Sequence, residues 1–194
     1  MANHKVIRNQ LIGISLSTLD GEEGIVKEAV RGDASSFGSL YDHYQPRIYR
    51  FILIKVSRKE EAEDLTHQVF LNAWQNIRSY KNRGNPFSSW LYKIARNQVI
   101  DYYRTAREES SIEDTNPEFF VTPAVAHTNL DKNLEFEKVL LALRHLEPGY
   151  QDVIIMRFVE GFSIKETAKI VNKSEGAVKL IQHRGINKLK AMLS

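Results

Sequence analysis

The chain has 194 residues, of which 42% are hydrophobic and 26% are charged, with a formal net charge of +3. This composition predicts one or two small folded domains and excludes a compositionally disordered protein. The absence of cysteine excludes a disulfide framework, a thiolate zinc site and a cysteine nucleophile. Because the net charge is small, any binding of nucleic acid must depend on local clusters of cations.

The amino-terminal segment 1–20 predicts a flexible tail. Its apolar run "LIGISLSTL" is short, interrupted by polar residues and without a small-residue cleavage site. No stretch reaches the roughly 18 apolar residues of a membrane span, so we expect no membrane insertion, and the lack of cysteine suits a reducing cytoplasm. From residue 22 onward the apolar spacing predicts successive helices and no strands, so the expected fold class is all-α.

Two amphipathic helices are predicted next. The first covers about 22–30 and ends at "RGD", where Gly32 suits a C-terminal cap. The second carries apolar and aromatic residues at spacings of three and four between Phe37 and Ile52. Pro46 is expected to kink or break this second helix, because proline lacks the amide hydrogen that the helix needs.

The third predicted helix, "RKEEAEDLTHQVFLNAWQNI", has an apolar stripe and an acidic face. The stripe consists of Ala62, Leu65, Val69, Ala73 and Ile77, with Phe70 and Trp74 alongside. The other face carries Glu60, Glu61, Glu63, Asp64, Gln68 and Asn72. A charged face of this kind fits a solvated surface and a docking surface equally well.

The fourth predicted helix is "FSSWLYKIARNQVIDYYR", residues 87–104, which Ser88 or Ser89 is expected to cap. One side carries Leu91, Ile94, Ala95 and Tyr102, and another carries Lys93, Arg96, Asn97, Ile100, Arg104 and Arg107. Aromatic residues surround the second side: Tyr80, Phe87, Trp90, Tyr92 and Tyr103. Exposure to solvent alone does not require this mixture of cations and rings.

The composition changes after the fourth helix. Residues 108–131 contain several carboxylates and two prolines but no lysine or arginine, which predicts an acidic linker. The expected layout is therefore a tail at 1–20, a front domain at 21–107, the linker at 108–131 and a second helical domain at 132–194.

The last two predicted helices form a helix-turn-helix. Ser163 and Glu166 make a capping box that opens a short helix, "NKS" is a tight turn, and Ser174 caps a longer helix. The longer helix turns Val178, Ile181, Gln182, Gly185 and Leu189 inward, with Ile186 at the margin, and Lys179, Leu180, His183, Arg184 and Asn187 outward. Such a pair suits a DNA major groove, and an ordinary helical hairpin with solvated lysines fits the same pattern.

Three motifs in a fixed order resemble one family. "AEDLTHQVFLNAW", "FSSWLYKIARNQVIDYYR" and "LEPGYQDVIIMRFVEGFSIKETAKIVNKSEGAVKLIQHRGINKLK" are similar to bacterial RNA polymerase sigma factors of the extracytoplasmic-function (ECF) group of the sigma-70 family. The resemblance covers about residues 22–193. It implies a chain that is not an enzyme and has no cofactor or metal. The implied partners are core RNA polymerase, promoter DNA and, as in many relatives, an anti-sigma factor.

The resemblance implies that the front domain melts the minus-ten element and captures the non-template strand. A single strand needs cations for its phosphates and ring faces for its unstacked bases. Asn97 matches the family position that contacts a flipped-out base. The other implied minus-ten residues are the pocket walls Tyr80 and Ile94 and the phosphate ligands Lys93, Arg96 and Arg104. Trp90 fits either a stacked base or the core.

The same resemblance implies two further surfaces. The clamp helices of the largest polymerase subunit would face Glu61, Asp64, Gln68 and Asn72, and the acidic linker would thread the active-site and RNA-exit channels. The minus-thirty-five element would be read by Ser174, Lys179, Leu180, His183 and Arg184. Ile181 and Ile186 replace arginines of one common family pattern, which leaves open the DNA sequence that is read.

The same residues bear on two other classes of function. A stand-alone helix-turn-helix regulator shares the last segment but has no use for "AEDLTHQVFLNAW" or the basic helix, and polymerase binding separates the two. A metal-dependent nuclease needs converging carboxylates or histidines, and Asp64 with His67 is the nearest such pair.

Overall fold

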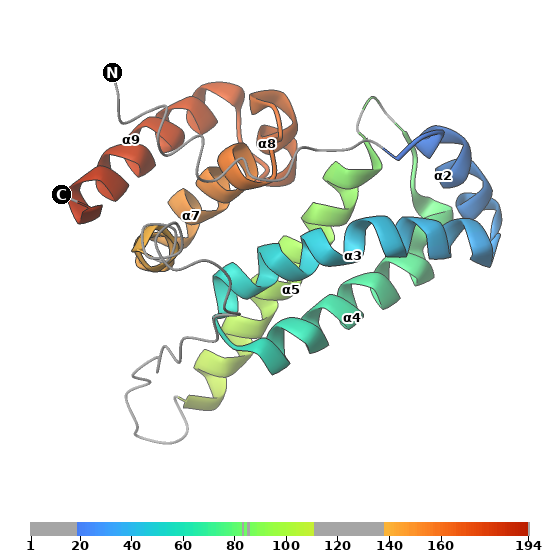
Figure 1. The fold of residues 1–194 in the computed structure, drawn as a ribbon, viewed down its shortest axis with the longest axis horizontal. Helices are drawn as coiled ribbons and strands as arrows, with labels where there is room; N and C mark the ends of the chain where they lie inside the picture. Colours follow the sequence, from blue (N-terminus) through green and yellow to red (C-terminus); the bar gives the residue numbers. More distant parts are fainter. Residues whose placement is uncertain (1–18, 83, 85, 111–137, 194) are drawn as a thin grey trace, which may run out of the picture. The chain divides into compact units, whose positions relative to one another are not determined.

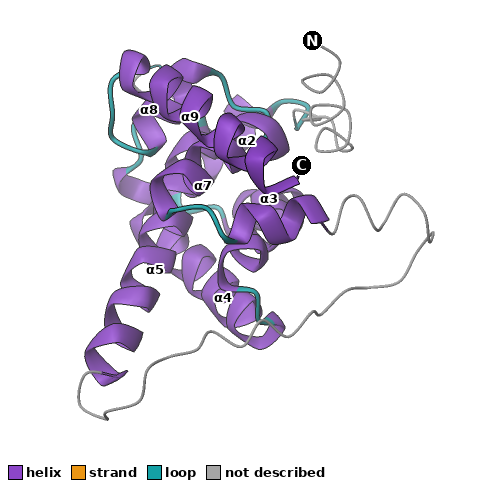
Figure 2. Cartoon of the chain, turned by 90° about the vertical axis from the view of Figure 1, so that its left-hand side faces the viewer, coloured by secondary structure: helices purple, strands orange, loops and turns teal. Residues whose placement is uncertain are grey.

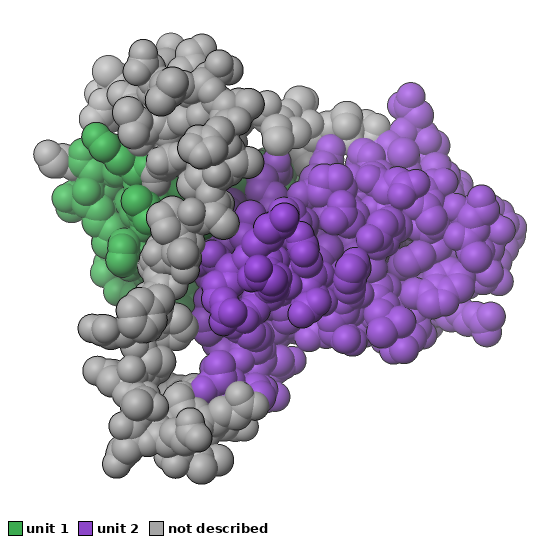
Figure 3. All heavy atoms as spheres, turned by 60° about the horizontal axis from the view of Figure 1, so that its bottom comes forward, with its two compact units in different colours: residues 1–18, 126–194 green, residues 19–125 purple. Residues whose placement is uncertain are grey.

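The computed structural model describes residues 19–82, 84, 86–110 and 138–193. The described residues form helices and loops and contain no strand (Figure 2), so the all-α prediction is confirmed. The chain divides into two compact units, one within residues 19–125 and one whose described part is 138–193 (Figure 3). Residues 1–18 of the expected tail at 1–20, and residues 111–131 of the expected linker at 108–131, lie outside the described residues.

The described part of the front unit is a group of four helices and a 3-10 turn, and the helices are labelled in Figure 1. These elements are α2 (Glu22–Arg31), α3 (Ala34–Val56), α4 (Lys59–Asn76), the 3-10 turn η1 (Ile77–Ser79) and α5 (Phe87–Ser110). Helices α3, α4 and α5 pack against one another in pairs, and α2 packs on α3 and η1. Gly32 ends α2 as predicted, since its φ of 101° suits glycine and its N–H bonds back to the carbonyl groups of Glu28 and Ala29.

Helix α3 continues through Pro46, so of the expected kink or break the break does not occur. Tyr44 and Ile48, on either side of the proline, are both buried and hold the two halves of the helix in the core. Pro46 itself is exposed, and the carbonyl group that loses its helical donor belongs to the exposed residue Asp42. Water can therefore replace the missing backbone hydrogen bond at little cost.

Helix α4 buries a wider arc than its apolar stripe predicted. Ala62, Val69 and Ala73 are buried as expected, but Leu65 is only half-buried. Thr66 is 1% exposed instead, because its hydroxyl donates a 2.6 Å hydrogen bond to the Ala62 carbonyl group and so needs no water. The physical reason is that α4 contacts both α3 and α5, and two neighbours cover more of a helix than one stripe.

Helix α5 begins one residue before the serines that were expected to cap it. Phe87 is its first residue, so Ser88 and Ser89 lie inside the first turn, and the prediction of a serine cap is wrong. The Ser89 N–H already donates to the Pro86 carbonyl group at 3.0 Å. At its other end α5 is tied to its neighbours: the Tyr103 hydroxyl donates to the Lys55 carbonyl group at 2.6 Å.

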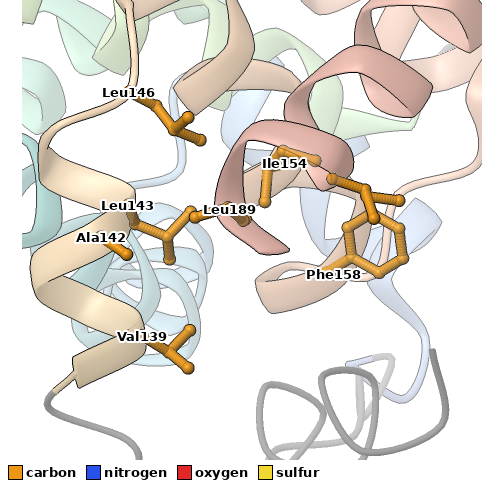
Figure 4. Packing of buried hydrophobic residues seen from close by; sticks show 8 residues of the cluster. Val139, Ala142, Leu143, Leu146, Ile154, Phe158 and Leu189 are labelled. Carbon is orange, nitrogen blue, oxygen red and sulfur yellow. The ribbon is translucent and has the colours of Figure 1, made fainter. Parts of the chain in front are cut away.

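The second unit contains a helical segment at 138–144, α7 (Pro148–Ile154), the π-helical turn η2 (Ile155–Val159), α8 (Ile164–Ile170) and α9 (Glu175–Leu193). Its core gathers residues from four of these elements (Figure 4): Val139, Ala142, Leu143, Leu146, Ile154, Phe158, Ile186 and Leu189. This cluster fixes the rotation of α9 about its own axis, since Ile186 and Leu189 must point into it. The opposite side of α9 is thereby turned to solvent.

Helices α8 and α9 form the predicted helix-turn-helix and pack on each other. The capping box is present: the Ser163 N–H donates to the Glu166 carboxylate at 2.7 Å, and the Glu166 N–H donates to the Ser163 hydroxyl at 3.2 Å. Asn172 makes the turn with a φ of 54°, which asparagine tolerates. Ser174 then caps α9 by accepting from the Ala177 N–H at 3.2 Å.

Candidate nucleic-acid and protein-docking surfaces

The basic face of α5 lies on the solvent side of the front unit. Leu91, Ala95 and Val99 are buried along one side of the helix. Of the residues expected on the other side, Lys93, Asn97 and Arg104 are exposed and Arg96 is half-buried. Ile94, which was expected on the side of Leu91, is half-buried as well. Arg104 also pairs with Asp101 at 3.2 Å, an exposed ion pair that water and salt weaken. The helix therefore presents an amide between cationic side chains, a surface that suits a nucleic-acid strand.

The aromatic residues near this face are more buried than the sequence suggested. Phe87 and Tyr92 belong to the core. Tyr80 is only 8% exposed, because its ring packs 5.6 Å from the Phe87 ring and 5.3 Å from the Trp90 ring. Burial and, after it, the charge of Glu22 raise the pKa of the Tyr80 hydroxyl. The half-buried Trp90 thus keeps more surface for a base than Tyr80 does.

A pocket beside Tyr80 was missed by sequence reasoning. It has a volume of about 530 Å³ and is lined on one side by α2 and on the other by Tyr80, Asn82, Pro86 and Phe87. Its charged lining comes from Glu22, Glu23 and Lys27 of α2, with Val26 and Val30 among its apolar walls. No local pattern in the sequence predicts this pocket, because it forms between α2 and residues that are far from α2 in the chain, from Tyr80 onward.

The acidic face of α4 carries some polar side chains that are exposed and others that are engaged by neighbouring residues. Asp64 and Gln68 are exposed. Glu61, by contrast, accepts a 2.6 Å hydrogen bond from the Tyr102 hydroxyl and pairs with Arg58 at 2.7 Å. Burial raises the pKa of Tyr102, and so does its hydrogen bond to Glu61. Asn72 is half-buried and accepts from the Asn76 amide at 2.8 Å.

The same region of α4 carries apolar surface that the sequence reading did not assign to it. Leu71 is 49% exposed. Trp74 was expected beside the core, but it is 37% exposed, and its ring centroid lies 4.9 Å from that of Phe37 in a tilted arrangement. Asp64, Gln68 and Leu71 recur at intervals of four and three and so share one side of the helix. A polar surface with an apolar centre is typical of a protein-docking site.

The outward stripe of α9 is exposed along its whole length, as predicted for Lys179, Leu180, His183, Arg184 and Asn187. Of the residues expected inside, Val178, Gly185 and Leu189 are buried, whereas Ile181 and Gln182 are half-buried. Gln182 is held by a 3.0 Å hydrogen bond from Arg157. His183 Nε2 lies 3.2 Å from the Asn187 side-chain amide, so the two polar side chains share one part of the stripe.

Comparisons with known proteins identify both units. The family model described as "Sigma-70 region 2" matches residues 40–109, and the model "Sigma-70, region 4" matches residues 136–189. The chain belongs to the sigma-70 family. These matches place α4 and α5 in region 2 of a sigma factor, and α7, α8 and α9 in region 4.

Relatives place the chain in the ECF group of that family. It is 31% identical to ECF RNA polymerase sigma factor SigX of Bacillus subtilis over 80% of this chain and 82% of SigX. It is 37% identical to ECF RNA polymerase sigma factor BldN of Streptomyces coelicolor over 87% of this chain and 64% of BldN, so it spans about two thirds of that relative's length. The predicted family is confirmed.

A solved structure supports the fold of this sigma factor. The sigma factor RpoE of Bartonella quintana, in complex with the anti-sigma factor NepR, matches with a TM-score of 0.72 and 24% identity over 82% of this chain and 98% of RpoE. At this identity the likeness concerns the fold alone.

The described residues offer no metal site that would support the alternative of a metal-dependent nuclease. Among the residues that the structure describes, no group of three or more histidine and carboxylate side chains is placed to hold a metal ion. The exposed pair Asp64 and His67 gains no third ligand there. Within the same residues, no helix combines the length and apolar character needed to cross a membrane.

Proposed function

We propose that this chain binds core RNA polymerase, directs it to specific promoters and assists promoter melting, as a dissociable sigma subunit in the cytoplasm. The observation that carries the proposal is the pairing of a region 2 unit and a region 4 unit in one chain, each with an exposed cationic helix face. A stand-alone regulator has no need for the first unit. The nucleotidyl transfer belongs to the polymerase, and this subunit performs no catalysis.

Three surfaces divide this work. Helix α4 meets the clamp helices of the largest polymerase subunit through Asp64, Gln68 and Asn72, with Leu71 and Trp74 exposed beside them. Glu61 contributes less at this surface, because Arg58 and Tyr102 already neutralise and hold its carboxylate.

DNA is assigned to α5 and α9. On α5, Asn97 contacts a flipped-out base of the minus-ten element, and Lys93, Arg96 and Arg104 hold phosphates. Ile94 and Trp90 supply apolar surface near Asn97, and Tyr80 supports Trp90 from the core side. On α9, the outward stripe reads the minus-thirty-five element, and Ser174 acts by capping the helix.

The proposed domain limits follow from the same assignment. A front domain at 21–107 and a second domain at 132–194 flank an acidic connector at 108–131, whose first residues, 108–110, continue helix α5. The two family models, at 40–109 and 136–189, support a division between these two domains. An anti-sigma factor is the proposed regulatory partner, supported by the complex of RpoE with NepR.

Transcription in vitro tests the proposal. Purified chain and bacterial core polymerase are incubated with a library of promoters, and start sites are sequenced. We expect initiation at a restricted set of promoters that depends on the chain. Promoter selection that is the same with and without the chain would refute the proposal.

A charge reversal tests the docking surface. Asp64→Lys is expected to weaken core binding in a fluorescence anisotropy titration while circular dichroism keeps the parent's helicity, because Asp64 is exposed. Asp42→Lys, the same change at an exposed position of α3, is the control and should bind core polymerase like the parent. Equal affinities of both variants and the parent would remove α4 from the interface.

A further inference from the structure

Leu180 is an apolar side chain in the middle of a cationic surface. It is 50% exposed, the largest exposed fraction among the exposed large hydrophobic residues of the described chain. Its neighbours on the exposed side of α9 are Lys179, His183 and Arg184. Helical spacing of three and four places His183 and Arg184 directly beside it.

The orientation of Leu180 is fixed by the core. Val178, Gly185 and Leu189 are buried, so α9 cannot rotate to bring Leu180 inward without exposing them. Leu180 is also the sixth residue of α9, which begins at Glu175. Residues in the amino-terminal part of a recognition helix are the ones that reach base edges in a major groove.

The surroundings of Leu180 indicate what it contacts. The nearest exposed large hydrophobic residues of the same helix are Met192 and Leu193, more than three turns away. A protein-docking patch requires contiguous apolar area from several side chains. A single exposed leucine that is surrounded by cationic side chains is instead complementary to one small apolar group on an anionic partner. In the major groove of DNA that group is the C5 methyl group of thymine.

We propose that Leu180 reads the methyl group of a thymine in the upstream promoter element, while Lys179 and Arg184 hold the flanking phosphates or base edges. This inference rests on the proposed function, since it requires α9 to lie in the major groove. It makes Leu180 a specificity-determining residue. It also gives the outward stripe a preference that a purely cationic surface lacks, because phosphates are the same at every base pair.

Replacement of thymine by deoxyuridine removes this methyl group and leaves base pairing unchanged. In a binding assay with the holoenzyme, each upstream thymine of a selected promoter is replaced in turn. We expect one position at which affinity falls about fourfold, the effect of one buried methyl group. Leu180→Ala should bind the thymine promoter about fourfold more weakly than the parent and should not distinguish thymine from deoxyuridine at that position.

Leu141→Ala is the matched control. Leu141 is an exposed leucine of the same unit, outside α9, and its variant should keep the parent's response to deoxyuridine. Circular dichroism confirms that each variant is folded. A parent that ignores deoxyuridine at every position, or a Leu180→Ala variant that keeps the full response, would overturn the inference. So would a loss of affinity for core polymerase without DNA, which would make Leu180 a protein contact.

The test separates this inference from the proposed function. If the parent holoenzyme selects upstream sequence but is indifferent to the methyl group, only the role of Leu180 fails. If the holoenzyme shows no upstream sequence preference at all, the assignment of α9 to the minus-thirty-five element fails with it.

Discussion

Two glycines inside helices should respond in opposite ways to the same substitution. Gly38 lies in α3, and Gly185 lies in α9, where it is buried. Replacing a glycine by alanine in a helix interior stabilises the folded state by roughly 1 kcal/mol, because alanine loses less backbone entropy on folding than glycine does. This gain is common to both sites, so any difference between them must come from the space around the new methyl group.

The structure shows that a Cβ atom would have different surroundings at the two sites. A Cβ atom built on Gly38 has no outside heavy atom within 4 Å. A Cβ atom on Gly185 lies 3.1 Å from Ile154 Cγ1, 3.3 Å from Ile154 Cδ1 and 3.4 Å from Tyr150 Cβ. Ile154 is fully buried in the core cluster and has little room to move. Overpacking of this kind costs about 1–3 kcal/mol. We therefore expect Gly38→Ala to stabilise by roughly 1 kcal/mol and Gly185→Ala to destabilise by about the same amount.

Urea denaturation with two probes measures both changes. The chain's two tryptophans, Trp74 and Trp90, lie in the front unit, so their fluorescence reports its unfolding, whereas circular dichroism reports helices of both units. Gly38→Ala should raise the fluorescence midpoint. Gly185→Ala should lower the midpoint measured by circular dichroism. A Gly185→Ala variant more stable than the parent would show that α9 can move away from α7, which contradicts the tight contact as the reason for glycine.

Three further predictions use individual side chains. Asn97→Ala should slow promoter opening, because the loss of a bidentate base contact costs about 1–3 kcal/mol, while core binding stays unchanged. Permanganate footprinting measures the opening, and opening at the parent's rate on duplex DNA would count against the base contact. Because the pKa of Tyr102 is raised by burial and by Glu61, the hydroxyl stays protonated in the folded chain at a pH where it ionises in the unfolded chain. The contribution of the Tyr102 hydroxyl to the free energy of unfolding is therefore complete below pH about 10 and is lost as the pH rises above it. The difference in unfolding free energy between the parent and Tyr102→Phe should shrink in urea titrations above that pH; a constant difference would refute the linkage. Ser163→Ala should destabilise the second unit by about 1 kcal/mol in the same titrations, and Ser163→Asn should retain most of the stability, since asparagine also caps; equal losses in both would mean that the hydroxyl acts in some other way than as a cap.

The sequence by itself determined the features that depend on near neighbours in the chain. The capping box of Ser163 and Glu166 and the outward stripe of α9 follow from spacings of three or four residues, which the geometry of a helix fixes. The Gly32 cap follows from the positive φ that glycine adopts readily. The three ordered motifs also determined the family, which the two family models and the relatives confirm.

Tertiary structure decided how much of the surface of each helix is buried, because a helix that packs against two neighbours buries more of its surface than a helix that packs against one. The burial of Thr66 in place of Leu65 and the continuation of α3 through Pro46 both depend on contacts with other helices. The engagement of Glu61 by Tyr102 joins residues 41 positions apart, so no local pattern could reveal that this carboxylate is occupied while Asp64 remains exposed. Helical periodicity orders residues around one axis, but only packing against other segments determines how far around that axis the core extends.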